Sequence, residues 1–245
     1  MTRITIISPD DTIVLRDDYR WRHHVCAIKK DGITGLFGTP AVRETPTDRP
    51  QEDGAYWPSR LTQKPRSISL DCVIRGLSSV EAAQARDRIN ALAGKELTIV
   101  EHTAAGRRML TGFLAADPEP MMRWREQGFE FGLVISCPDP LKYGEPVTFP
   151  ASGGVIRVRN EGNAPTWPSI AVTGHATSLR LTLGDGEVLW RGDADWLTLD
   201  FHDMIPSTGT VTKDLAFRIP PGTSAVTVAA DAGAQVSMTV RPAWR

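Results

Sequence analysis

Apolar and polar positions are patterned most regularly between residues 66 and 93. Up to Ile74 every second residue is apolar, which is typical of a strand with one buried face. A glycine then interrupts the alternation. Ser78 and Glu81 have the spacing of a capping box, in which each side chain bonds to the backbone of the other residue. The apolar residues that follow have a helical period, so the sequence predicts a helix over 79–93.

A second run of strict alternation covers 129–137 and predicts another half-buried strand. Shorter runs predict further strands at 3–7, 12–15, 24–29, 96–102 and 107–115. Between these elements, 31–65 carries repeated glycines and prolines and has no periodic pattern. A loop of this length inside a compact domain is unusual, and such loops tend to be functional or to be ordered by a partner.

The pattern changes character after residue 140. Prolines and a Ser-Gly-Gly cluster punctuate 140–153, which predicts a domain boundary there. Beyond it, short alternating runs and no helical pattern predict strands at 155–159, 168–173, 179–183, 187–191, 196–201, 215–219, 224–229 and 234–241. Such a series is typical of a β-sandwich or jelly roll. We therefore expect a mainly β chain with two domains, 1–145 and 146–245.

The composition is that of an ordinary globular protein, with 41% hydrophobic and 23% charged residues. The net charge of -1 argues against a broad phosphate-binding surface. No apolar run has the length of a membrane span, and the N-terminus lacks the apolar core of a signal peptide, so we expect a cytoplasmic protein without membrane insertion. The three cysteines form no CxxC pair, which predicts free and mostly buried thiols.

Known catalytic motifs are absent from the sequence. It contains neither the phosphate-binding GxxxxGK[ST] pattern nor the GxSxG pattern of a nucleophilic serine. His23 and His24 are adjacent, so on a strand they would point to opposite faces and could not share a metal. The remaining histidines stand alone: His102, His175 and His202. We expect no catalytic residue, no metal ligand and no cofactor, and a role other than that of an enzyme. A cell-wall hydrolase would need two converging carboxylates in a cleft, which no spacing in the sequence indicates.

Two residue groups are compatible with ligand binding. Aspartates of the second half, together with Trp190 or Trp196 as a stacking surface, are candidates for a calcium or sugar site: Asp185, Asp193, Asp195, Asp200 and Asp203. The simpler interpretation places these aspartates in turns and the tryptophans in a core or an interface. Arg107-Arg108 and Arg123-Trp124-Arg125 mix cations with an aromatic ring, as a nucleic-acid groove does. Neighbouring acidic residues favour a solvated or subunit-contacting surface instead.

Several short motifs, taken in order, resemble those of the phage distal tail protein (Dit) family, hub components at the tip of long non-contractile tails. The resemblance rests on Gly35–Pro40 with Arg43, Asp53–Tyr56 with Arg60, Arg66–Leu70, the helix that follows, Asn163–Ile170, Val172–Gly174, Phe217–Ser224 and Arg241–Trp244. One departure is Thr223-Ser224 after a Pro-Gly step, where the family often has asparagine.

The resemblance implies an N-terminal β-barrel-like domain with one helix and a C-terminal galectin-like β-sandwich. Six copies would form a ring under the last ring of the tail tube, with a tail-associated hub or fibre protein below. DNA would pass through the channel without specific binding. The protein would be assembled in the host cytoplasm and located at the virion tail tip. An alternative function is a carbohydrate-binding module for host adhesion. The galectin-like shape does not by itself indicate sugar binding, because one fold can carry different functions.

The 31–65 loop is the expected site of contact between subunits. Ordering a long glycine- and proline-rich segment costs conformational entropy, and contacts with a neighbouring subunit can offset that cost. Rings have head-to-tail contacts that use two different surfaces of each subunit. The residues expected in this oligomer interface are Phe37, Pro40, Arg43, Tyr56, Trp57 and Arg60.

Overall fold

The computed structural model describes residues 2–17 and 26–245 and divides into two compact units. Unit 1 comprises Met1–Lys142 with Arg245, and unit 2 comprises Tyr143–Trp244. Each unit has a hydrophobic core of its own. None of the helices in the described ranges has the length and apolarity that a membrane span requires.

Unit 1 is a closed β-barrel with one helix. It contains β1 (Arg3–Ile7), β2 (Thr12–Arg16), β3 (Cys26–Thr34), β4 (Arg66–Arg75), α1 (Ser79–Asn90), β5 (Leu97–Thr103), β6 (Gly106–Leu114), β7 (Met121–Arg123) and β8 (Gly128–Cys137). The strands are hydrogen-bonded in the order β6-β5-β1-β2-β3-β4-β8-β7. Because β6 also pairs with β8, the sheet closes on itself and the barrel side of each strand is buried. The predictions of a mainly β chain and of an N-terminal barrel with one helix are confirmed.

The two strands with strict alternation form the longest ladder of the barrel. β4 and β8 pair antiparallel from Arg66 opposite Cys137 to Arg75 opposite Gly128. The apolar residues that alternate along both strands are all buried: Ile68, Leu70, Cys72, Ile74, Phe129, Phe131, Leu133, Ile135 and Cys137. A one-residue slip would turn every one of them outward, so the alternation specifies the register.

The predicted capping box is present at the start of α1, but the helix ends earlier than predicted. Ser78 accepts a hydrogen bond from the N–H of Glu81, and the Glu81 side chain accepts one from the N–H of Ser78. The helix ends at Asn90 instead of residue 93, because tight turns replace the helical bonds after Ile89. Ala93 is consequently exposed rather than buried in the predicted apolar stripe.

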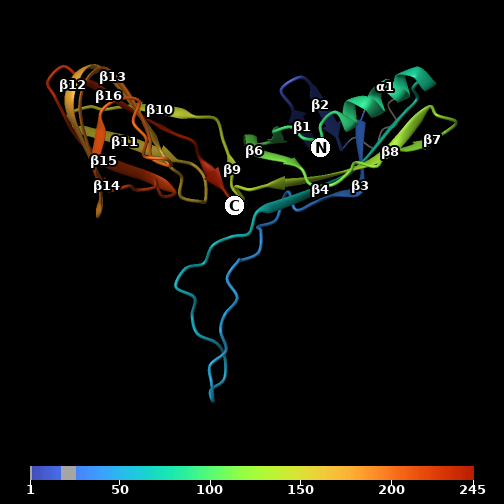
Figure 1. The fold of residues 1–245 in the computed structure, drawn as a ribbon, viewed down its shortest axis with the longest axis horizontal. Coiled ribbons are helices and arrows are strands. Elements are labelled where there is room, and N and C mark those ends of the chain that lie inside the picture. The colour runs from blue at the N-terminus through green and yellow to red at the C-terminus, as the bar shows by residue number, and fades with distance from the viewer. Residues whose placement is uncertain (1, 18–25) are drawn as a thin grey trace. The chain divides into compact units, whose positions relative to one another are not determined.

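Unit 2 is built around one long bent hairpin. Its strands are β10 (Val147–Pro150), β11 (Val155–Asn160), β12 (Ser169–Leu183), β13 (Gly186–Asp200), β14 (Thr210–Leu215), β15 (Gly222–Ala230), β16 (Gln235–Val240) and β17 (Ala243–Trp244), and β9 (Lys142–Tyr143) lies at the junction of the two units (Figure 1). β12 pairs with β13 along its length, with β16 over its first third and with β15 near its end. The register shifts between Thr173 and Ser178, so the hairpin bends and both of its halves bury residues in one core.

Three strand predictions in unit 2 are wrong in detail. The separate strands predicted at 168–173 and 179–183, and at 187–191 and 196–201, are the halves of β12 and β13. A strand at 215–219 is not found, since β14 covers Thr210–Leu215 and the Asp214 side chain accepts the N–H of Ala216 just beyond it. β10 lies within the segment predicted as a linker.

Candidate functional site: a projecting arm and a groove beside the helix

Residues 35–65 form an antiparallel excursion, here called the arm, that projects from the end of the barrel where β3 stops and β4 begins (Figure 1). Two pairs of backbone hydrogen bonds hold its limbs together. Near the base, the N–H of Arg43 donates to the carbonyl of Thr62 at 2.8 Å, and that of Lys64 donates to Ala41 at 2.9 Å. Near the tip, the N–H of Tyr56 donates to the carbonyl of Thr47 at 2.8 Å, and that of Arg49 donates to the carbonyl of Gly54 at 3.1 Å. Of the segment 31–65 that was predicted as an irregular loop, residues 31–34 continue β3, and the rest is an extended arm with sparse internal bonding.

A glycine sets the course of the chain into the arm. Gly35 has φ +75°, a conformation that side chains disfavour. A Cβ at this position would lie 1.9 Å from the carbonyl oxygen of Ser67. Only glycine can therefore bring the chain this close to β4. Leu36 follows and is completely buried in the barrel core, which pins the outgoing limb.

Arg66 holds the outgoing limb of the arm at its base. Its side chain is only 1% exposed. Nη1 donates to the carbonyl oxygens of Gly35, Leu36 and Gly38, at 2.8, 3.2 and 2.6 Å, and Nε donates to Pro140 at 2.9 Å. Burial lowers the pKa of the Arg66 guanidinium from its usual value. The planar fork of arginine suits such a cluster of carbonyls, so Arg66 positions the arm. From the sequence, Arg66 was noted only as part of a motif, because its partners lie far away along the chain.

A carboxylate stabilises the middle of the arm. Glu44 accepts hydrogen bonds from the backbone N–H of Thr62, at 2.8 Å, and from its hydroxyl. These bonds hold the pKa of the Glu44 carboxyl below its usual value. At the tip, Arg49 pairs with Glu52 at 3.4 Å and lies 5.7 Å from the ring centre of Tyr56.

The arm exposes large apolar side chains. Trp57 is 82% exposed, and Phe37, Val42, Tyr56 and Leu61 are also classed among the exposed large hydrophobic residues. Large exposed apolar groups on one projection mark an interaction surface. Val42 and Leu61 were missed from the sequence, where no periodicity distinguishes them.

The six residues predicted for an oligomer interface all lie on the arm, but they do not form one cluster. Phe37 and Pro40 lie near the base, where the Phe37 ring centre is 5.8 Å from Nζ of Lys142. Tyr56 and Trp57 lie toward the tip, as the pairing of Tyr56 with Thr47 shows. Arg43 and Arg60 lie between the base and the tip, one on each limb, and both are exposed. The structure contains no second copy, so their role in an interface stays a prediction.

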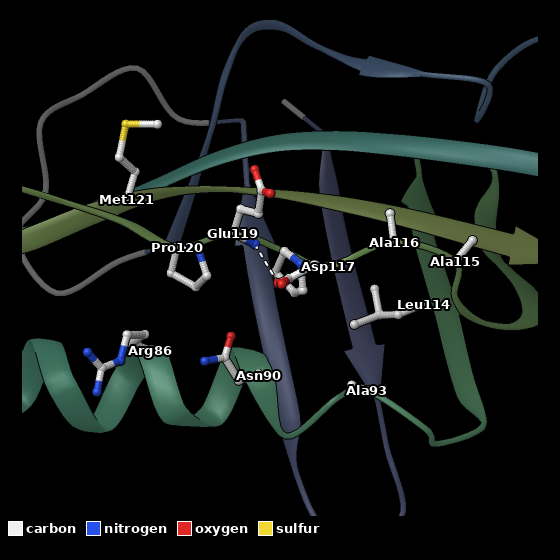
Figure 2. A pocket seen from close by; sticks show the side chains of 11 residues that line it. Arg86, Asn90, Ala93, Leu114, Ala115, Ala116, Asp117, Glu119, Pro120 and Met121 are labelled. Atoms are coloured by element: carbon white, nitrogen blue, oxygen red, sulfur yellow. Dashed lines mark hydrogen bonds between the residues drawn. The ribbon is translucent and has the colours of Figure 1, made fainter.

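A groove of 960 Å³ lies between α1 and the segment 114–121, and we call it the helix groove. Arg86 and Asn90 line it from the helix, and Ala93 lies just beyond the helix end (Figure 2). The other side is formed by Leu114–Met121. Here the N–H of Glu119 donates to the Asp117 carboxylate at 2.9 Å, and Gly132 donates to the carbonyl of Pro118 at 3.1 Å. A second hollow of 420 Å³ adjoins it and shares Leu114 with it.

The proposed sugar or calcium site in unit 2 is not assembled as the sequence suggested. Trp190 is 0% exposed and donates its indole N–H to the carbonyl of Thr208 at 2.7 Å, so it cannot stack on a sugar. Trp196 is 57% exposed and remains accessible. His175 lies 3.6 Å from Asp193 and 3.5 Å from Asp195. Within the described ranges, no group of three or more His, Cys, Asp or Glu side chains is placed to hold a metal ion. His23 and His24 lie outside the described residues.

The two basic clusters are engaged with neighbouring side chains. Arg123 lies 3.9 Å from Glu130, which also accepts from Lys29 at 3.1 Å. The guanidinium of Arg75 lies 5.9 Å from the ring centre of Trp124. Arg107 lies on β6 opposite His102. These contacts agree with a surface of mixed charge rather than a nucleic-acid groove.

Comparisons with known proteins define the fold. The sequence matches no family model and no curated protein. The structure is similar to the crystal structure of the Dit protein of phage SPP1, which is described as a paradigm of the hub adsorption apparatus in phages that infect Gram-positive bacteria. The TM-score is 0.71 at 15% sequence identity, and the match covers 97% of this chain and 98% of that chain. It is also similar to the phage P2 baseplate in its activated conformation, with a TM-score of 0.55 at 11% identity in the calcium form and 0.55 at 10% in the strontium form, each over 98% of both chains.

The fold is therefore that of hub and baseplate proteins of phage tail tips. More particularly, the chain shares the fold of the SPP1 Dit protein over nearly its whole length. The resemblance to Dit proteins that the sequence motifs indicated is confirmed at the level of the fold.

Proposed function

We propose that this protein is a non-enzymatic structural component of a phage tail tip, in which copies of the chain form a ring that joins the tail tube to the tail-tip hub. The fold shared with Dit and baseplate proteins supports the class of function. The observation that carries the assembly role is the arm. It is anchored at its base by the buried Arg66 and exposes much of Tyr56 and Trp57, a surface that another molecule can cover.

The proposed partners are other copies of the chain, in a six-membered ring, the tail tube protein and a hub or fibre protein. The ring would be assembled in the host cytoplasm and function at the virion tail tip, with DNA passing through its channel without specific binding. The small net charge of -1 agrees with a channel that does not hold DNA. The galectin-like shape of unit 2 stays a prediction.

Imaging of the purified full chain tests the proposal. We expect particles with six-fold symmetry by negative-stain electron microscopy, with the tube protein added if the chain alone is monomeric. The variant Tyr56→Ala/Trp57→Ala should shift the population toward monomers, whereas Trp196→Ala in unit 2 should assemble like the natural chain. A chain that stays monomeric with its tube protein present would contradict the proposal.

A carbohydrate-binding role is the second candidate, and the exposure of Trp196 favours it. An accessible indole is a stacking surface for a sugar ring. Pulldown with host cell walls distinguishes the two functions. Loss of binding in Trp196→Ala, with binding retained in Trp57→Ala, would favour adhesion, whereas equal behaviour of both variants and the natural chain would exclude Trp196 as a sugar site.

A further inference from the structure

A ring of identical subunits needs two different contact surfaces on each chain, because its contacts are head-to-tail. The arm supplies one of them. The inference below rests on the proposed ring and concerns the second surface, which must accept the arm of the next copy.

The helix groove is placed where a chain's own arm cannot fill it. The arm joins one end of β4 at Arg66. The other end of β4 lies at Arg75, and α1 with its groove follows that end. A strand of 10 residues spans about 33 Å. The arm also points away from α1 (Figure 1). The groove is therefore open to the arm of another molecule and closed to its own.

The returning limb of the arm, residues 55–65, matches the groove in polarity. This limb carries the exposed apolar side chains of Tyr56, Trp57 and Leu61. The groove offers apolar surface from Ala93, Leu114, Ala115, Ala116, Pro118, Pro120 and Met121, beside the polar side chains of Arg86, Asn90, Asp117 and Glu119. Its volume of 960 Å³ is at the upper end of the range that binding pockets occupy, which leaves room for two aromatic side chains.

The charges of the two surfaces are also complementary. Residues 55–65 contain the cations Arg60 and Lys64 and no acidic residue. The segment 114–121 contains Asp117 and Glu119 and no basic residue. On the helix side, Arg86 is paired with Asp87 at 3.1 Å. Opposite charges on facing surfaces direct the encounter and select the correct partner.

We propose that the helix groove of one subunit receives the returning limb of the arm from a neighbouring copy, with Trp57 of that copy inserted between α1 and the segment 114–121. An indole buried among apolar groups is the type of anchor that dominates interface energy. The exposed aromatic tip of the arm thereby acquires a defined receptor on the same chain.

Cross-linking locates the receptor directly. A photoreactive benzoylphenylalanine replaces Trp57 in the full chain, the assembled particles are irradiated, and the linked peptides are identified by mass spectrometry. We expect links from position 57 to peptides that contain 79–94 or 114–121 of another copy, shown to be intermolecular by mixing isotopically labelled and unlabelled chains. The inference would be overturned if the rings are verified and position 57 is cross-linked only to other surfaces of the chain, or only to a tube or hub protein.

A charged substitution in the groove provides an independent test. Ala93→Arg adds a bulky cation to the exposed wall of the groove, where it repels the cationic limb, and Ala105→Arg makes the same change at the exposed β5–β6 turn. We expect Ala93→Arg to raise the concentration needed for assembly at least tenfold while its thermal unfolding stays unchanged, and Ala105→Arg to assemble like the natural chain. Rings formed normally by Ala93→Arg would overturn the groove as receptor and leave the proposed function standing. If the natural chain forms no ring even with its tube protein, the proposed function and the groove as receptor are both overturned.

Discussion

At the scale of single residues, the arm depends on two positions whose partners lie far away in the sequence. Gly35 allows a close approach to the carbonyl of Ser67, and Arg66 bonds the carbonyls of Gly35 and of residues that follow it. Replacing either residue should affect the arm without removing much apolar surface from the barrel core.

Gly35→Ala should destabilise unit 1 more than the same change at Gly94. Both glycines have nearly equal positive φ, +75° and +72°, but a Cβ at Gly94 meets nothing within 4 Å. We expect Gly94→Ala to cost about 1–2 kcal/mol from the backbone conformation alone. Gly35→Ala should exceed it by about 1–3 kcal/mol because the backbone must move away from Ser67. Urea unfolding of both variants measures the difference, and equal losses would show that the close approach is not maintained.

The ion pair between Asp11 and Arg88 should make stability depend on pH. Arg88 donates to both carboxylate oxygens at 2.8 Å, and these bonds lower the pKa of the Asp11 carboxyl in the folded state. A lowered folded pKa stabilises the fold above the unfolded value of about 3.9, and this contribution disappears as the pH falls through the folded pKa. The pair is partly exposed, so Asp11→Asn should cost about 0.2–1 kcal/mol at pH 7, and this cost should shrink as the pH falls below the unfolded pKa of about 3.9. Denaturant unfolding over a series of falling pH values checks this, with Arg88→Gln expected to show the same dependence. A loss that does not shrink toward acid pH would point to another cause.

At the scale of elements, the arm and the barrel strands differ in how their backbone groups are satisfied. β4 is paired along its full length with β8 and in part with β3. The arm is bonded at two separated points, at 41–43 with 62–64 and at 47–49 with 54–56. Side chains satisfy further backbone groups of the arm only locally, since Glu44 accepts the N–H of Thr62 and Arg66 donates to carbonyls near the base.

Hydrogen exchange should detect this difference. In the unassembled protein we expect amides of the arm to exchange orders of magnitude faster than those of β4 and β8, since few buried contacts protect them. In assembled rings, protection should appear in 55–65 and around α1 together. Mass spectrometry of the peptides measures both states, and an arm that exchanges equally fast in the ring would contradict a role in subunit contact.

At the scale of the whole molecule, the chain contains two cores joined at residues 142 and 143. A unit with its own core is expected to fold by itself. The chain should then unfold in more than one step rather than as one cooperative system.

The fragment 143–245 should fold alone. We expect its far-ultraviolet circular dichroism to be that of a β protein, and its fluorescence to shift on unfolding as the buried Trp190 becomes exposed. The variant Trp190→Phe serves as the control that assigns this signal. A fragment without cooperative unfolding would show that unit 2 depends on unit 1.

The local pattern of the chain predicted those parts of the fold that depend on neighbouring residues. Alternation gave the buried faces of β4 and β8 correctly, and the Ser78–Glu81 spacing gave the start of α1. The end of the helix, the continuity of β12 across its bend and the position of β14 were mispredicted, because tertiary pairing overrode local signals.

For the candidate site, the sequence by itself determined that 31–65 is an exceptional segment, and it led to the prediction that six of its residues form an interface. Only the tertiary structure decided that this segment is an arm anchored by Arg66, whose bond to Pro140 spans 74 positions. It also decided that Trp190 is buried and Trp196 exposed, and that α1 and 114–121 enclose a groove. The physical reason is that period and capping are set by residues within a few positions of each other, whereas anchors, burial and grooves arise between residues that only the closed barrel and the bent hairpin bring together.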